Sequence, residues 1–101
     1  MNNGGYIPEV LRRRAQYLSE TMKEVCGFDP TEETRRRDVV MARIMVVYVL
    51  LLEGWSENQI GSVMGWDHST INYYRKRMIA ILTTPGYNAE IDIWEKFRQT
   101  I

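Results

Sequence analysis

The most apolar part of the chain, residues 44–52, constrains the fold more than any other segment. Four more apolar positions precede it at 39–42, so Arg43 is the one charge in this whole run. A helix made from the run is apolar on nearly every side, and other elements must therefore cover it. The run is too short for a membrane span, which needs about 20 apolar residues. It predicts a buried central helix at about residues 38–53, closed by a left-handed cap at Gly54.

The remaining segments also show helical periodicity, with apolar residues at three- and four-residue steps. They predict helices at about residues 8–26, 56–64, 68–82 and 89–100. The apolar stripes are Val10, Leu11, Ala15, Leu18, Met22 and Cys26 in the first of these, Ile71, Tyr74, Met78, Ile81 and Leu82 in the third, and Ile91, Trp94, Phe97 and Ile101 in the last. No segment alternates as a strand does. We expect an all-α fold, a single compact domain of about five helices at residues 9–101 after a flexible N-terminus at 1–8.

Composition limits the possible partners. The 101 residues carry 13 Lys or Arg and 13 Asp or Glu, so the formal net charge is zero. Proteins that bind nucleic acid usually have a basic excess, so a neutral chain must gather its cations on one face to do so. The single cysteine, Cys26, excludes an internal disulfide and disfavours a thiolate metal site, as is typical of the reducing cytosol. We expect a cytoplasmic protein with no signal peptide, no membrane segment, no metal and no other cofactor.

Residues 56–82 have the pattern of two helices joined by a tight turn. Ser56 and Gln59 match a capping box at the start of the short helix, and Gly65 with Trp66 marks the turn. Asp67 is an N-cap candidate for the longer helix that follows. This is a helix-turn-helix arrangement, whose DNA-binding form places the second helix in the major groove. Many helix pairs of this kind never contact DNA, so the pattern alone leaves both interpretations open.

The longer helix has a polar face that suits DNA. Its candidate contacts are Ser69, Thr70, Asn72, Tyr73, Arg75 and Lys76. The hydroxyl and amide groups can hydrogen-bond to base edges, and Asn pairs well with adenine. The cations, together with Arg77, lie further along the helix, where phosphates would run. Short polar side chains are also favourable in a first helical turn, which is the structural alternative for the first two residues of this set.

A basic run lies in the polar connection before the central helix. Arg35, Arg36, Arg37 and Arg43 set four positive charges against Asp38 over residues 35–43. Cations at the start of a helix oppose its dipole, so the run does not serve to stabilise the helix. We interpret it as a phosphate-binding footprint, although a solvated run entering a helix has the same composition. Most acidic residues lie in other segments, which allows a basic face on a neutral chain.

Two stretches resemble a known family: Arg-Arg-Arg-Asp-Val-Val-Met-Ala-Arg at 35–43 and Ile-Gly-Ser-Val-Met-Gly-Trp-Asp-His-Ser-Thr-Ile at 60–71. With the helix between them, they resemble the C-terminal DNA-binding domain (domain IV) of bacterial DnaA replication initiators, over about residues 9–82. That family has a basic loop, an arginine at the start of the next helix, and a helix-turn-helix whose second helix opens with Asp-His-Thr-Thr. The resemblance implies a Trp-repressor-like fold that binds double-stranded DNA.

The resemblance also implies roles for single residues. Arg35 matches the arginine that enters the minor groove, where the negative potential suits a guanidinium. Arg43 matches a contact residue at the start of the long helix. His68, Ser69 and Thr70 match the residues that read bases in the major groove, a role that their hydrogen-bonding groups and the threonine methyl support.

The chain also departs from the family. Ile44 stands where many members have Gln, the turn is one residue shorter, and Trp66 replaces a basic residue. The family's recognition sequence is therefore not carried over. The Walker A motif of the initiators' ATPase domain is missing as well. We expect a stand-alone DNA-binding domain with a regulatory or replication-associated role at the bacterial nucleoid.

Two classes of function follow from these patterns. The first is sequence-specific binding of double-stranded DNA, with a second copy of the chain or a replication or regulatory protein as candidate further partners. The alternative is a small helical adaptor that keeps the fold without binding DNA, which the zero net charge and Ile44 favour. An enzyme acting on a small-molecule substrate is not expected, because the chain has one histidine, no implied Cys-His pair and no cluster of metal ligands.

Overall fold

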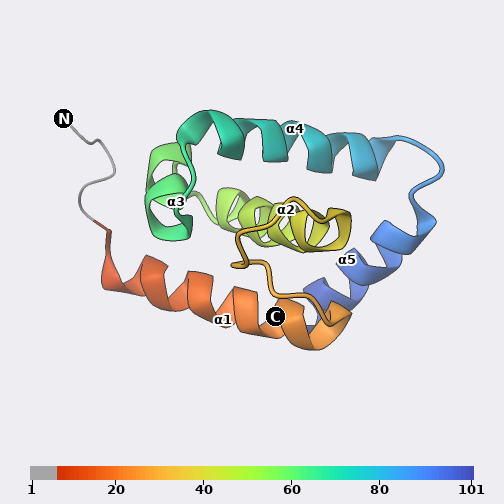
Figure 1. The fold of residues 1–101 in the computed structure, drawn as a ribbon, viewed down its shortest axis with the longest axis horizontal. Helices are drawn as coiled ribbons and strands as arrows, with labels where there is room; N and C mark the ends of the chain where they lie inside the picture. Colours follow the sequence, from red (N-terminus) through yellow and green to blue (C-terminus); the bar gives the residue numbers. More distant parts are fainter. Residues whose placement is uncertain (1–6) are drawn as a thin grey trace.

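The computed structural model describes residues 7–101, which form five α-helices (Figure 1). The helices are α1 (Glu9–Cys26), α2 (Arg37–Leu52), α3 (Glu57–Met64), α4 (His68–Thr83) and α5 (Asn88–Thr100). The all-α prediction is confirmed, and each helix begins and ends within one residue of its expected position. Residues 1–6 of the predicted flexible N-terminus lie outside the described part of the chain. Ile7 packs against the core and Pro8 directly precedes α1, so these two residues belong to the folded domain.

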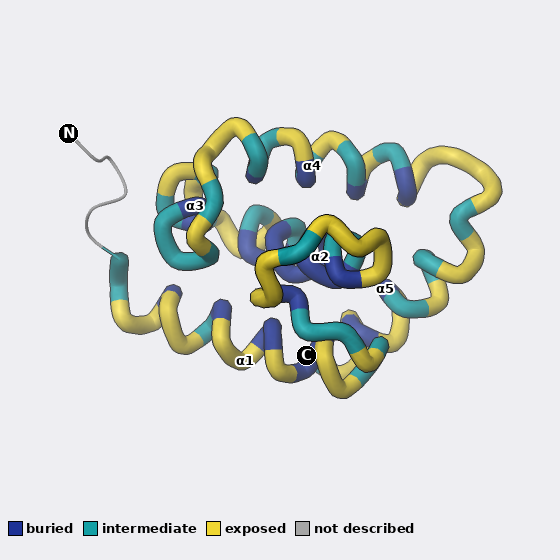
Figure 2. Tube along the Cα trace, in the orientation of Figure 1, coloured by how far each residue is buried: buried dark blue, intermediate teal, exposed yellow. Residues whose placement is uncertain are grey.

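The central position predicted for the apolar helix is confirmed. α2 lies between α1 and α4, and α3 crosses one end of the fold (Figure 1). Met45, Val46, Val47 and Leu50 of α2 are completely buried. The buried residues of α1 and α4 face α2, whereas their exposed residues face outward (Figure 2). Because neighbours cover α2 on several sides, it needs no polar face of its own.

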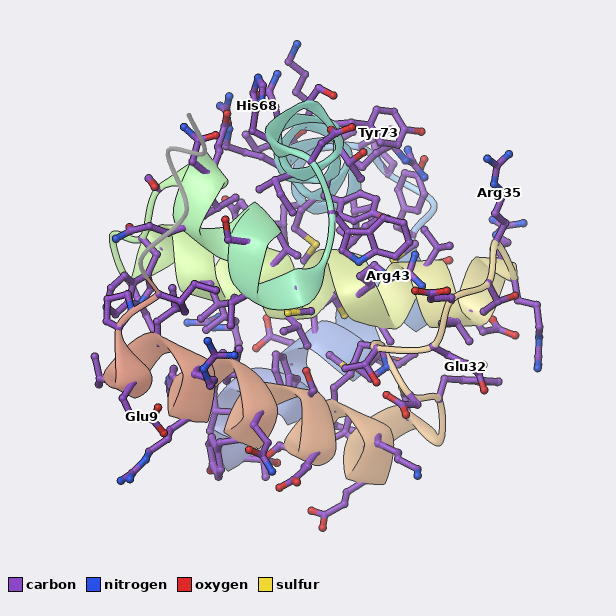
Figure 3. All side chains as sticks on the ribbon, turned by 60° about the vertical axis from the view of Figure 1, so that its left-hand side comes forward. Glu9, Glu32, Arg35, Arg43, His68 and Tyr73 are labelled. Carbon is purple, nitrogen blue, oxygen red and sulfur yellow. The ribbon has the colours of Figure 1, made fainter. Side chains whose placement is uncertain are left out.

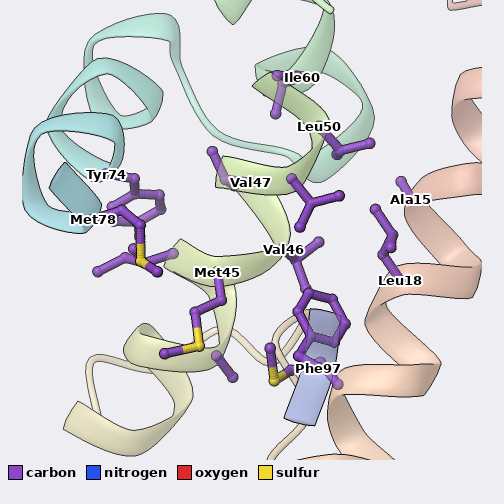
Figure 4. Close-up of a cluster of buried hydrophobic side chains, with 14 of the residues drawn as sticks. Ala15, Leu18, Met45, Val46, Val47, Leu50, Ile60, Tyr74, Met78 and Phe97 are labelled. Carbon is purple, nitrogen blue, oxygen red and sulfur yellow. The ribbon is translucent and has the colours of Figure 1, made fainter. Parts of the chain in front are cut away.

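α5 closes the core mainly through aromatic side chains. Phe97 is completely buried and Trp94 nearly so. The ring of Tyr48 in α2 meets that of Trp94 in an edge-on arrangement, with centroids 5.8 Å apart. Figure 4 shows Phe97 reaching the cluster that Val46 of α2 and Leu18 of α1 help to form. One apolar core therefore joins α1, α2 and α5.

Some predicted stripe positions are not buried. Val10 is 63% exposed and Leu82 is 39% exposed, so their assignment to the core is wrong. Each is adjacent to a core residue, Leu11 or Ile81, and one step along a helix turns the side chain by about 100°. Cys26, Ile91 and Ile101 are only half-buried. Over residues 7–101, no helix combines the length and the apolar character needed to cross a bilayer.

Candidate nucleic-acid interface

Three residues, Gly65, Trp66 and Asp67, connect α3 to α4. At the start of α3 the predicted capping box is present. The Gln59 backbone N–H donates to Ser56 Oγ at 3.1 Å, and the Ser56 N–H donates to Gln59 Oε1 at 3.0 Å. These bonds satisfy N–H groups that have no partner within the helix. The local sequence therefore determines where α3 begins.

Two glycines allow α3 and α4 to be joined so closely. Gly65 has a φ of 84°, in the left-handed region that favours glycine. The N–H groups of Gly65 and Trp66 both donate to the Gly61 carbonyl oxygen, at 2.8 and 2.9 Å. A Cβ atom at Gly61 would collide with the carbonyl oxygen of Trp66. α4 therefore begins at a closely defined position relative to α3.

Asp67 caps the N-terminus of α4, as predicted. Its Oδ1 accepts the Thr70 N–H at 2.9 Å and the Ser69 hydroxyl at 2.6 Å. The hydrogen bond from Ser69, followed by that from the Thr70 N–H, stabilises the carboxylate and lowers the pKa of Asp67. The Ser69 hydroxyl proton is used within the cap, so toward an external ligand this side chain offers its oxygen as an acceptor.

The polar face predicted for α4 lies on its outer side. His68, Ser69, Tyr73 and Lys76 are exposed, and Tyr73 is 57% exposed in spite of its aromatic ring. Figure 3 shows His68 and Tyr73 pointing away from the core. Thr70, Asn72 and Arg75 are half-buried at the edges of this face. The buried positions on the opposite side of α4 are Ile71, Tyr74, Met78 and Ile81.

The basic run lies where the loop at residues 27–36, here called the basic loop, enters α2. Arg35, Arg36 and Arg37 are all exposed, and Figure 3 shows Arg35 projecting outward. Within residues 7–101, none of the three forms an ion pair with a carboxylate. The Arg36 guanidinium lies over the Phe28 ring, 5.5 Å from its centroid. The three charges are therefore available to an external anion.

A groove of about 430 Å³, here called the loop–α4 groove, separates the basic loop from α4. Thr34 and Arg35 line it from the loop, together with the acidic Glu33, and Thr70 and Tyr73 line it from α4. These segments are far apart in the sequence. They meet because α2, which carries the loop at its N-terminal end, packs against α4. The fold thus brings two of the predicted contact regions to one side of the molecule.

Arg43 lines the loop–α4 groove from α2, beneath the basic loop. The residue is only 1% exposed, so its guanidinium faces the protein interior rather than the outer surface where the sequence predicted a DNA contact. The guanidinium donates to the Pro30 carbonyl and to the Tyr74 hydroxyl, both at 3.1 Å, and lies 4.4 Å from the centroid of the Trp66 ring. The physical reason is its place on the apolar central helix, where position 43 faces the loop and α4. Sequence reasoning missed Tyr74 and Trp66 as its partners, although a lone charge inside an apolar run was a signal of a buried, hydrogen-bonded arginine.

Arg75 is also held by neighbours. Its Nη2 lies 3.4 Å from Oε2 of Glu57 in α3 and donates to Asn72 Oδ1. The Arg75–Glu57 pair is partly exposed and contributes little to stability, so it can open. Asn72 can offer its whole amide to adenine only after Arg75 releases the oxygen. Glu57 lies outside both basic segments in the sequence, but the fold brings it to α4. Lys76 forms no ion pair among the described residues.

No family model, curated protein or solved structure matches this chain. The resemblance to the DnaA domain therefore stays a prediction that depends on residues 35–43 and 60–71. In the described part of the chain, no three His, Cys, Asp or Glu side chains gather to hold a metal ion.

Proposed function

We propose that the chain binds double-stranded DNA in a sequence-specific manner. In this proposal α3 and α4 act as a helix-turn-helix, with α4 in the major groove and the basic loop on the adjacent backbone and minor groove. The observation that carries the proposal is the loop–α4 groove, because Arg35 of the basic loop and Thr70 and Tyr73 of α4 line it together. A recognition helix combined with a basic segment that reaches the neighbouring minor groove is a known way to grip a duplex.

Local charge supports the proposal in spite of the zero net charge. Arg35, Arg36, Arg37 and Lys76 are exposed and form no ion pair within residues 7–101. Contacts between such cations and phosphates supply nearly all of the affinity for random DNA and part of the affinity for a specific site, and they release bound counterions. In Figure 3, Glu9 of α1 lies far from both His68 and Arg35. Because only these few cations face the duplex in this proposal, we expect weak binding to random DNA and a larger contribution from specific contacts.

The two regions have different roles in this proposal. His68, Ser69 and Thr70 occupy the first turn of α4, the part of a recognition helix that contacts base edges. The basic loop contributes phosphate contacts, and Arg35 contributes a contact in the narrow minor groove. The family resemblance adds a regulatory or replication-associated role as a stand-alone domain, found with the nucleoid of a bacterial cell.

The direct test is fluorescence anisotropy with labelled duplexes at about 50 mM and about 200 mM salt, using a sequence selected from a random duplex pool. We expect the logarithm of the association constant to fall linearly with the logarithm of the salt concentration, with a slope of about −0.9 for each phosphate neutralised. No binding at the low salt concentration, or binding that is insensitive to salt, would refute the proposal.

Substitutions separate the two roles. Arg35→Ala should weaken binding to selected and random duplexes alike, whereas His68→Ala or Thr70→Ala should lower discrimination between them by about 1–3 kcal/mol for each lost base contact. Arg13→Ala is the matched control, because it removes one exposed arginine from α1. Equal losses on both duplexes for Arg35→Ala, His68→Ala and Thr70→Ala would show that α4 does not read bases.

The alternative function is that of a small helical adaptor. Ile79 and Leu82, in the second half of α4, are 42% and 39% exposed, and with Tyr73 they give the helix exposed apolar side chains that suit a protein partner. A second copy of the chain is the simplest such partner. A molecular mass that increases with protein concentration in sedimentation, together with no salt-dependent DNA binding, would favour this function.

A further inference from the structure

Arg43 connects the basic loop to the central helix. From α2, its guanidinium donates to three backbone carbonyls of the loop: those of Pro30 at 3.1 Å, of Glu32, and of Thr34 at 3.3 Å. The loop's own bonds are local, such as the one from the Thr34 N–H to the Glu32 carbonyl at 3.0 Å. The bonds from Arg43 therefore attach the loop to the body of the fold.

The same side chain also contacts the α3–α4 unit. Its Nη1 donates to the Tyr74 hydroxyl of α4 at 3.1 Å, and Tyr74 is itself 5% exposed. The plane of the guanidinium lies near the Trp66 ring of the turn, with 4.4 Å between the central carbon and the ring centroid. One buried residue thus holds the loop, the turn and α4 at defined distances from one another.

A buried arginine at position 43 carries a large desolvation cost. A buried charge that is hydrogen-bonded to carbonyls and a phenol, rather than paired with a carboxylate, retains much of its desolvation cost. An apolar side chain of similar volume often gives equal or greater stability at such a site. What an apolar side chain cannot supply is a rigid, planar set of five donors that can hold several carbonyls at once. The advantage of arginine here is therefore that it fixes the position of the loop, rather than that it stabilises the fold.

We infer that Arg43 is a positioning residue for DNA binding. Without touching the DNA, it holds the basic loop on α4, so that Arg35 and the outer face of α4 reach one duplex as a single preformed surface. Thr34, whose carbonyl Arg43 holds, directly precedes Arg35 in the chain. A preformed loop avoids the entropy cost of ordering on binding. The role in DNA binding rests on the proposed function, whereas the anchoring of the loop can be measured without DNA.

The first test is limited trypsin digestion of the free protein. Trypsin cleaves after arginine, and the loop and its junction with α2 carry Arg35, Arg36 and Arg37. In Arg43→Met, with helical circular dichroism unchanged, we expect cleavage at these sites to be about tenfold faster than in the wild type, since local opening governs proteolysis. Arg14→Met is the matched control. Arg14 also joins two parts of the fold, through Glu53 at 2.6 Å, but far from this loop in the chain.

The second test asks whether Arg43 acts through Arg35. By anisotropy, Arg35→Ala should weaken duplex binding about tenfold in the wild type but less than about twofold in the Arg43→Met background, because residues that act through one another are not additive. Additive effects would overturn the inference, since they would mean that Arg35 contributes equally whether or not Arg43 holds the loop.

Arg43→Lys keeps the test decisive if the methionine variant does not fold. Lysine retains the charge but not the planar donor set, so loop cleavage should still be severalfold faster. If the wild type binds DNA while Arg43→Lys changes neither the cleavage rate nor the effect of Arg35→Ala, the inference is refuted. If the loop is loosened but the wild type binds no duplex, the proposed function fails and the anchoring role stands.

Discussion

The substitution Gly61→Ala sets two physical effects of opposite sign against each other in α3. In the interior of a helix, alanine is more favourable than glycine by about 1 kcal/mol. In this fold, however, the added Cβ would collide with the carbonyl oxygen of Trp66 in the turn between α3 and α4. That oxygen is a backbone atom and cannot rotate away as the end of a side chain could. The turn must therefore move to admit the methyl group.

The cost of this movement can be worked out from the contacts at the turn. Overpacking of a tight site costs about 1–3 kcal/mol. Moving the turn also disturbs the hydrogen bonds that Gly65 and Trp66 donate to the Gly61 oxygen, each worth about 1 kcal/mol. After the gain of about 1 kcal/mol from helix propensity is subtracted, we expect the free energy of unfolding to fall by about 2–4 kcal/mol. For a domain of this size, that lowers Tm by about 10–30 °C.

Thermal and urea unfolding followed by circular dichroism measure this difference. Ser62→Ala is the matched control, because it places alanine at the next position of the same helix and should raise stability by up to about 0.5 kcal/mol. A Tm of Gly61→Ala at or above that of the wild type would contradict this expectation. That result would mean that the turn moves freely and that α4 is not held in place by its approach to α3.

Two further predictions concern charged side chains of α3, α4 and the turn between them. Asp67→Asn should reduce the acid sensitivity of the fold, because the hydrogen bonds from Ser69 and Thr70 lower the pKa of Asp67 below its ordinary value of 3.8. The stabilising contribution of Asp67 is therefore present above that value and is lost as the pH falls through the lower, folded-state pKa, whereas an asparagine cap does not titrate. Urea titrations from about pH 6 to about pH 3 check this, and an unchanged pH dependence would contradict it. Glu57→Gln should free Arg75 for a phosphate, so that DNA binding strengthens and the salt slope steepens by about 0.9 in anisotropy; an unaltered slope would show that Arg75 reaches no phosphate.

The secondary structure could be predicted closely because the signals for it are local. The capping box at Ser56 and Gln59 and the cap at Asp67 involve bonds over two or three residues, and all of them form. The apolar run around α2 required a central position, since no other arrangement removes so many apolar side chains from water. The apolar periodicity of α1 and α4 was a less exact guide. Val10 and Leu82 each lie next to a residue of the core stripe but face solvent.

The composition of the candidate site was decided by contacts between residues that are distant in the chain. Local sequence placed the polar residues on α4 and the arginines before α2, but not the groove between them, which exists only because α2 packs against α4. Arg43 has the same charge as Arg35, yet one is buried under the loop and the other projects outward. Glu57 neutralises Arg75 only through the close approach of α3 to α4. Charge and helical phase are properties of a residue and its near neighbours, whereas burial and pairing depend on which helices meet, and the packing of the whole core determines that.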